Sequence, residues 1–310
     1  ETLGKLEPAV LATHAPAIVA KLEDSDWSVR REAVETLGKL EPAVLATHAP
    51  AIVAKLEDSE RFVREVAMRS LEKLEPAVLA THAPAIVAKL EDSDWSVRLV
   101  AVETLGKLEP AVLATHAPAI VAKLDDSDGS VRRVAVETLE KLEPAVLATH
   151  APAIVAKLED SDGSVRWVAM WTLGKLEPAV LATHAPTIVA KLEDSDGSVR
   201  HEAMRILGKL EPAVLATHAP AIVAKLEDSI KGVRLWAVKT LRKLEMLGEF
   251  EALDPAVQLR MQAVETKKAA RKRKWAADEG EKSPLADVDK KLIGKIQRKG
   301  QANAHDSASL

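Results

Sequence analysis

Histidine recurs in this chain at a fixed spacing of 34 residues, a pattern that could serve metal binding or a pH switch. The positions are His14, His48, His82, His116, His150, His184 and His218. Imidazole binds metals and changes its charge near neutral pH. In stacked helices, however, such copies would lie about 10 Å apart, whereas zinc–nitrogen bonds are about 2 Å long. We therefore expect a structural role for these side chains, and neither a metal site nor a cofactor.

Acidic turns accompany the histidines, and the first of them is EDSD at residues 23–26. Their carboxylates could bind calcium, but the twelve-residue spacing, the central glycine and the closing glutamate of an EF-hand are missing. Glycine-rich phosphate loops and a Ser-His-Asp arrangement are missing from the sequence as well. Because the same carboxylates return in every copy, they are typical of a scaffold. We expect no catalytic residues and no enzyme.

A basic run stands near the C-terminal end of the sequence. Residues 267–274 (KKAARKRK) contain six cationic side chains, namely Lys267, Lys268, Arg271, Lys272, Arg273 and Lys274. Such a run suits a nuclear-import signal, a nucleic-acid patch or a solvated helix end. Residues 1–245 carry 30 Lys/Arg against 37 Asp/Glu, whereas residues 246–310 carry 13 against 10. The acidic body argues against phosphate-backbone binding by the body as a whole.

The spacing of all these groups reflects a 34-residue unit that occurs seven times. The block Glu7 to Leu40 restarts at Glu41, Glu75, Glu109, Glu143, Glu177 and Glu211, and residues 1–6 match the end of a unit. A fixed period of this length indicates one supersecondary unit that buries its apolar face only by stacking on its neighbours. We therefore expect a repeat array over residues 1–245, and we expect the chain to be a truncated form, a processed product or a piece of a longer array.

Each unit predicts two helices. The first covers about residues 8–23, with Pro8 in its first turn, where a missing N–H is harmless, and Pro16 inside it, where we expect a kink. Its apolar positions are Val10, Leu11, Ile18, Val19 and Leu22. Residues 24–26 provide a turn and an N-cap for the second helix, at about residues 27–40. That helix is expected to bury one stripe, formed by Val29, Ala33, Leu37 and Leu40.

The unit resembles the HEAT repeat. The resemblance rests on Pro16, Asp24, Val29, Arg30 and Ala33, whose counterparts return in every unit up to residue 245. A tetratricopeptide repeat would need a Tyr-containing signature and an ankyrin repeat a Thr-Pro-Leu-His element, and the chain has neither. The resemblance implies a right-handed α-solenoid, with first helices on the convex side and second helices lining a concave groove. It also implies a ladder in which the Asp24 and Arg30 counterparts bond between repeats.

The units differ mainly in the second helix, at the positions of Trp27, Arg31, Glu32, Glu35 and Gly38. Positions 27, 31, 35 and 38 form a stripe that faces away from the core, because position 29 lies 200° around the helix from position 27. Tryptophan and arginine in such a stripe are typical of binding hot spots; gap filling between helices or neutral drift is the alternative. The partner-binding candidates are Trp27, Arg31, Arg61, Arg69, Trp95, Arg133, Trp167, Trp171, His201, Arg205, Trp236 and Lys239.

The repeat pattern ends after Leu244. Residues 246–277 are expected to form capping helices that end in the basic run, with Val257, Met261 and Val264 covering the end of the stack. Residues 278–310 are expected to form a linker, a short amphipathic helix and a disordered tail.

These observations predict an all-α solenoid that acts as a non-enzymatic scaffold or adaptor and binds a protein partner through the concave surface of its second helices. One alternative is a nucleic-acid-binding solenoid that uses groove Arg and Trp residues and the basic segment. Another is a structural accessory subunit of a large complex. No apolar run approaches the ~20 residues of a transmembrane helix. The chain contains no cysteine, which excludes disulfides and thiolate metal sites but does not decide the compartment. The location is left open, with an intracellular one favoured.

Overall fold

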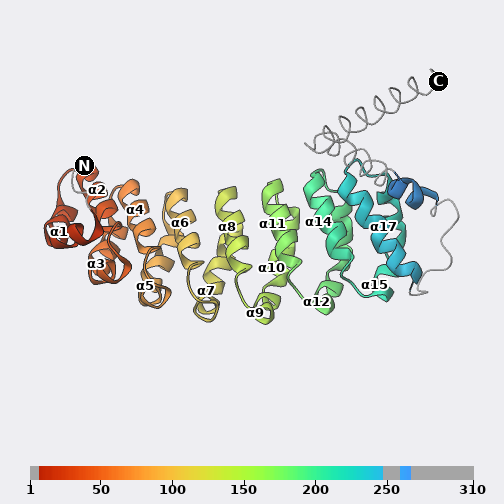
Figure 1. The fold of residues 1–310 in the computed structure, drawn as a ribbon, viewed down its shortest axis with the longest axis horizontal. Coiled ribbons are helices and arrows are strands. Elements are labelled where there is room, and N and C mark those ends of the chain that lie inside the picture. Colours follow the sequence, from red (N-terminus) through yellow and green to blue (C-terminus); the bar gives the residue numbers. More distant parts are fainter. Residues whose placement is uncertain (1–6, 247–258, 267–310) are drawn as a thin grey trace, which may run out of the picture. The chain divides into compact units, whose positions relative to one another are not determined.

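The computed structural model describes residues 7–246 and 259–266, which form helices and no strand. They belong to two compact units, Glu1–His218 and Ala219–Leu310. In the first unit the helices of the repeats stack side by side, with first and second helices in separate rows (Figure 1). The predicted all-α solenoid is therefore confirmed. No helix within the described ranges combines the length and the apolar character needed to cross a bilayer.

The second helices of the first unit have nearly constant bounds. They are α2 (Trp27–Leu37), α4 (Arg61–Leu71), α6 (Trp95–Leu105), α8 (Gly129–Leu139), α11 (Gly163–Leu173) and α14 (Gly197–Leu207). The 3-10 turns that precede them are η2 (Lys21–Glu23), η3 (Lys55–Glu57), η4 (Lys89–Glu91), η5 (Lys123–Asp125), η6 (Lys157–Glu159) and η7 (Lys191–Glu193). Asp26 caps α2 as predicted, because its Oδ1 accepts a hydrogen bond from the Ser28 backbone N–H at 2.8 Å.

The first helices are continuous in four repeats and divided in the next three. The continuous ones are α1 (Pro8–Ala20), α3 (Pro42–Ala54), α5 (Pro76–Ala88) and α7 (Pro110–Ala122). The divided ones are α9 (Pro144–Thr149) with α10 (Ala151–Ala156) and α12 (Pro178–Thr183) with α13 (Ala185–Ala190). In the seventh repeat, α15 (Pro212–Ala216) ends the first unit. Each division falls just before the internal proline, where a backbone N–H is missing, so the predicted disturbance is confirmed in these repeats.

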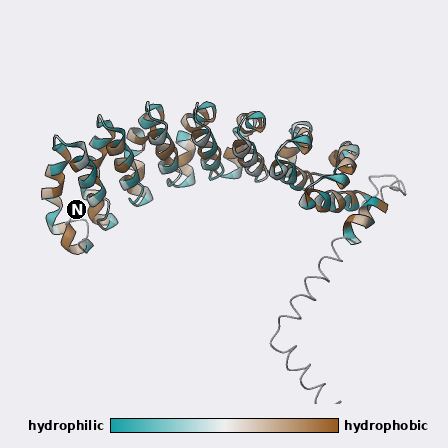
Figure 2. Ribbon diagram, turned by 90° about the horizontal axis from the view of Figure 1, so that it is seen from above, coloured by the Kyte–Doolittle hydropathy of each residue, from teal (hydrophilic) through white to brown (hydrophobic). Residues whose placement is uncertain are grey.

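The core of each repeat follows a narrower stripe of the first helix than the sequence predicts. Leu11, Ala15 and Ile18 are buried, at positions i, i+4 and i+7 of one face. Val10, by contrast, is 46% exposed, and Val19 is only half-buried, so these two apolar positions lie at the edge of the core. Each lies one residue, or 100°, to the side of the buried stripe. Figure 2 shows the resulting alternation of apolar and polar stretches along the helices.

The second helices bury the stripe that their sequence predicts. Ala33, Leu37 and Leu40 are at most 5% exposed. Val29 is half-buried, and its counterparts are fully buried, namely Val63, Val97, Val131, Val165, Val199 and Val233. The predicted interface between the two helix rows is therefore confirmed.

An arginine–aspartate ladder joins neighbouring repeats, as the HEAT resemblance implies. Arg30 donates from Nε and Nη2 to the two carboxylate oxygens of Asp58, at 2.7 and 2.8 Å. Its Nη1 donates to the backbone carbonyls of Asp24 and Ser25, so one guanidinium holds two successive turns. The same contacts recur in Arg64–Asp92, Arg98–Asp126, Arg132–Asp160 and Arg166–Asp194. Bidentate pairs of this kind are among the strongest hydrogen bonds in proteins.

A second ladder, which the sequence did not reveal, runs in the opposite direction. Lys55 Nζ lies 2.8 Å from Glu23 of the preceding repeat. Equivalent pairs are Lys89–Glu57, Lys123–Glu91, Lys157–Asp125 and Lys191–Glu159. The lysine is largely buried while the carboxylate is exposed, so the aliphatic stem contributes packing and the pair itself contributes little.

Acid is expected to weaken the arginine ladder. Burial alone would raise the pKa of Asp58, but hydrogen bonds from Arg30 and from the Glu60 backbone outweigh it and hold that pKa below the ordinary value. The same direction holds for the other ladder aspartates, Asp92, Asp126, Asp160 and Asp194. A lowered folded-state pKa contributes stability that is present above the unfolded pKa and lost as pH falls through the folded pKa.

We therefore expect the melting temperature to change little between pH 7 and 5.5 and to fall by roughly 10 °C or more by pH 3. Circular dichroism melts at these pH values provide the measurement. An unchanged melting temperature at pH 3 would contradict the stabilising role of the ladder.

The second unit contains α16 (Ala219–Ala224), η8 (Lys225–Glu227), α17 (Lys231–Met246) and a helix at 259–266. Met261 is buried and Val264 is half-buried, while the capping role expected for this helix stays a prediction. Arg242 pairs with Glu265 at 2.6 Å, and Arg260 lies 3.8 Å from Glu227. These contacts hold the helix against the unit. The predicted boundary at residue 245 stays a prediction, and Val257, the basic run at 267–274 and the segment 278–310 lie outside the described residues.

Candidate functional site

The positions equivalent to Trp27, Arg31 and Glu35 lie on one side of the row of second helices, which we call the second-helix face. Neighbouring second helices pack against each other far more closely than neighbouring first helices do. The second helices therefore form the more tightly packed of the two rows in the first unit.

The tryptophans of this face are not enclosed between repeats. Trp27, Trp95 and Trp167 are 40%, 46% and 38% exposed. Trp171 is half-buried. Large apolar side chains left in water on a rigid helix are candidate anchors for a partner. In the second unit, Trp236 is half-buried and lies beneath Lys239, whose Nζ is 4.1 Å from the ring centroid.

The strongest pair of candidates forms one cluster. The rings of Trp167 and Trp171 stack with their centroids 6.0 Å apart, one turn apart on α11. Trp171 Nε1 donates to Glu140 at the end of α8, at 3.1 Å. Lys175 Nζ lies 5.0 Å above the Trp171 ring and 3.1 Å from the same Glu140 carboxylate. Trp171 is thereby fixed, and Trp167 stacks on it with its outer part open.

The cluster extends to α14 through Arg205. The Arg205 Cζ atom lies 5.2 Å from the Trp171 ring centroid, and Arg205 Nε donates to both carboxylate oxygens of Glu202 at 2.8 Å. Glu202 is only 3% exposed, so this ion pair is largely removed from water. The hydrogen bond to Glu202 raises the pKa of Arg205 further above its ordinary value. We call Trp167, Trp171, Glu140, Lys175 and Arg205 the tryptophan cluster.

A second aromatic contact lies between the first two repeats. The rings of Trp27 and Phe62 stack with centroids 5.7 Å apart, and the Arg61 guanidinium lies 4.5 Å from the Phe62 centroid. Phe62 is not among the binding candidates predicted from the sequence. Its signal is that it occupies a position where Ser28 and most of its counterparts are serine.

The arginines of the face already have carboxylate partners. Arg31 lies 4.0 Å from Glu35 and Arg69 lies 3.2 Å from Glu65, while Arg133 pairs with Glu137. Arg61 bonds Asp94 at 2.9 Å; burial would raise the pKa of that carboxyl, but hydrogen bonds from Ser96 and Arg61 lower it to about 2. His201 is half-buried on α14. A face neutralised in this way offers little net charge to a phosphate backbone.

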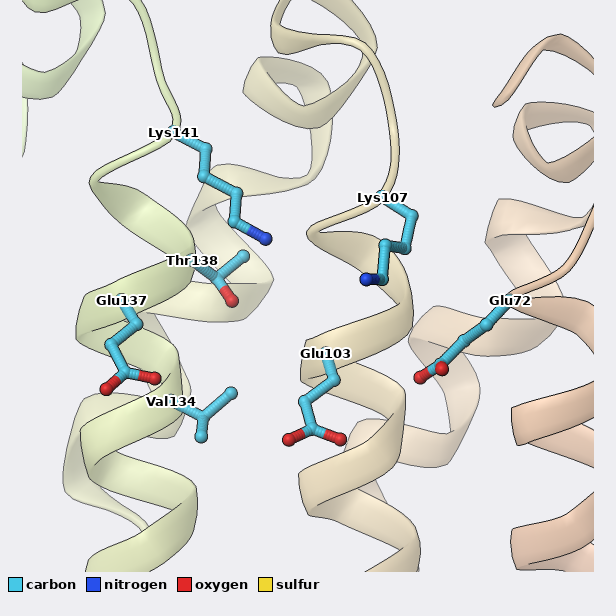
Figure 3. A pocket seen from close by; sticks show the side chains of 7 residues that line it. All are labelled: Glu72, Glu103, Lys107, Val134, Glu137, Thr138 and Lys141. Carbon is cyan, nitrogen blue, oxygen red and sulfur yellow. The ribbon is translucent and has the colours of Figure 1, made fainter. Parts of the chain in front are cut away.

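Between α4, α6 and α8 the face is hollowed into a pocket of about 350 Å³ (Figure 3). Its lining residues are Glu72, Glu103, Lys107, Val134, Glu137, Thr138 and Lys141. Among the described residues, no group of histidines and carboxylates is arranged to hold a metal ion.

Two solved structures are similar to the chain, and the first of them has a similar fold. None of the curated proteins matches the chain. A crystal structure of an engineered protein has a TM-score of 0.56 at 15% identity, covering 84% of this chain and 81% of that one. The complex of CpcE and CpcF of phycocyanin lyase from Nostoc sp. PCC7120 has a TM-score of 0.43 at 24% identity, with 81% and 94% of the chains covered.

The sequence itself matches a family profile in two overlapping stretches, residues 2–176 and 66–211. That family is described as sister chromatid cohesion protein PDS5, and its repeats are HEAT-like. The matched stretches include the proline, aspartate and arginine positions that carried the resemblance, and the ladder shows those side chains acting as the resemblance implied. The chain belongs to the PDS5 family of HEAT-repeat proteins.

Proposed function

We propose that this protein is a non-enzymatic scaffold that binds a protein partner through the second-helix face, with the tryptophan cluster as the central contact. The repeat family and fold support an interaction role in general. The observation that carries the finer proposal is the geometry of Trp167 and Trp171. One indole is fixed by Glu140 and Lys175, and the other stacks on it and remains open to water.

A rigid, partly exposed aromatic pair suits binding because little side-chain freedom is lost when a partner covers it. Tryptophan and arginine dominate the energetics of many protein interfaces, and both occur in the cluster. The family description names sister chromatid cohesion. We therefore propose a chromosome-associated protein as the partner. Nucleic-acid binding by the face is the less favoured function, because its arginines are paired with carboxylates.

Replacing Trp167 and Trp171 together by alanine is expected to remove partner binding while the helical content stays unchanged. Both side chains project from the face rather than into the repeat core, so their loss leaves the core stripe of α11 intact. Partners are first captured from native extract in the presence of nuclease. The affinity of each captured protein for the purified wild-type chain and for the double variant is then measured.

Val10→Ala serves as the control, because it removes an exposed apolar side chain from the first-helix row. Binding that is equal in the double variant and the wild type would refute the proposal. So would a large loss of helicity in the double variant, since the two indoles would then be structural.

A further inference from the structure

The pocket on the second-helix face brings unlike charges together from three repeats. Glu103 and Lys107 come from the α6 region, Glu137 and Lys141 from the α8 region, and Glu72 from the end of α4. In Figure 3 the carboxylates of Glu103 and Glu137 lie on neighbouring helices, and the lysine side chains lie nearer the helix ends. Residues four apart on a helix are separated by about 6 Å along its axis. The pocket therefore has an acidic level and a basic level about one turn apart.

Some of these charged groups form no direct ion pair within the described structure. Glu103 and Lys107 make neither an ion pair nor a side-chain hydrogen bond with any described residue. Lys141 Nζ donates to the neutral carbonyl of Gly106 at 2.9 Å, and Glu72 accepts from the hydroxyl of Thr104 at 3.2 Å. The equivalent pair in the first repeat differs, because Glu35 lies 3.7 Å from Lys39 and 4.0 Å from Arg31.

The electrostatics agree with this geometry. Burial and the neighbouring Glu103 raise the pKa of Glu72, and this outweighs the hydrogen bond from Thr104 and the attraction of Lys107, which lower it. Burial likewise lowers the pKa of Lys141, and the neighbouring Lys107 lowers it further. Both shifts favour the neutral forms, so neither charge is fully compensated by its surroundings. A ligand that places a cation at the carboxylates and an anion at the lysines would compensate both sets of charges.

We infer that this pocket receives a segment of the protein partner in which a basic and an acidic side chain are neighbours. The basic group meets Glu103, beside the Glu137 that already pairs with Arg133, and the acidic group meets Lys107 and Lys141. Charge complementarity selects this occupant over a purely basic or purely acidic segment, each of which would meet repulsion at one level of the pocket. Val134 and Thr138 form the wall against which the aliphatic stems would pack.

The pocket and the tryptophan cluster share the helix α8, because Glu137 lines the one and Glu140 belongs to the other. A segment of a few residues that crosses α6, α8 and α11 would thus meet mixed charge first and an aromatic anchor next. The inference rests on the proposed function. It adds that the partner's binding segment contains neighbouring basic and acidic residues.

The test uses four acetylated, fluorescent twelve-residue peptides with alternating Arg and Glu, Arg and Ser, Glu and Ser, or only Gly and Ser. Anisotropy titrations against the full chain are expected to show the Arg/Glu peptide binding at least fivefold more tightly than the others. Glu103→Gln and Lys107→Gln should each remove that preference. The matched variants Glu35→Gln and Lys39→Gln, outside the pocket, should leave it unchanged. Circular dichroism checks that each variant is folded.

Equal binding of all four peptides, or an Arg/Ser peptide that binds best, would overturn the inference. Insensitivity of Arg/Glu binding to Glu103→Gln and Lys107→Gln would also overturn it. The proposed function is tested by a different result from the one that tests this inference. If capture of the partner depends on Trp167 and Trp171 but not on Glu103 and Lys107, the scaffold function stands and the charged-segment inference falls.

Discussion

Replacing Arg98 by alanine is expected to lower the free energy of unfolding by about 3–5 kcal/mol. The side chain joins the third and fourth repeats through two bonds to Asp126 and two to the carbonyls of Asp92 and Ser93. Asp126 is only 4% exposed at its side chain, so the variant leaves a carboxylate that is shielded from water and has lost its cation. Its remaining bond, from the Asp128 N–H, does not replace the lost charge.

Chemical denaturation followed by circular dichroism measures this loss. Arg98→Met combined with Asp126→Asn is the control, because it removes both charges and should be much less destabilising than the single variant. In a stacked array each repeat contacts only its neighbours, so the weakened junction should also split the unfolding transition into two. A single transition with stability within 1 kcal/mol of wild type would contradict this account.

Arg205→Ala is expected to lower the free energy of unfolding by a comparable amount, about 3–5 kcal/mol. Here the cause is an ion pair within a single repeat. The substitution leaves Glu202 buried without its partner. The same position holds valine in four preceding repeats, and three of these side chains, Val100, Val134 and Val168, are buried. Glu202→Val should therefore be close to neutral or stabilising, although it touches the same ion pair.

The double variant Glu202→Val with Arg205→Ala should recover most of the stability lost in Arg205→Ala, as denaturant titrations would show. It should not recover partner binding, since Arg205 also lies over the Trp171 ring. A double variant as unstable as Arg205→Ala would show that the buried charge is not the cause.

Much of the fold was predictable because every local signal repeats. The proline at position 8, the aspartate cap at position 26 and the stripe from Ala33 to Leu40 depend on residues close in sequence, and the structure has them as predicted. The arginine ladder came from the resemblance to a known repeat. The lysine ladder was missed because nothing near Lys55 in the sequence indicates that it reaches back to Glu23.

Two positions that vary between repeats are covered in some repeats and open in others. At position 32, Val100 and Glu202 are buried, whereas Glu32 is half-buried. At position 38, which was expected to face away from the core, Gly38 is buried and Glu140 is half-buried, so the outward stripe is interrupted there in part of the array. Periodicity within one helix reports which side faces its own repeat. It does not report which side the next repeat covers, and this is why the pocket and Phe62 were found only in three dimensions.

The two ladders have a consequence for how such a protein can change in length. Each turn presents the same forward-reaching guanidinium and the same backward-reaching ammonium to its neighbours. If one complete module were excised or duplicated, the newly adjoining turns would find chemically identical partners, and the junction would need no compensating substitution. The length of the array can therefore vary through gene duplication, while the side chains of the second-helix face diverge independently of it.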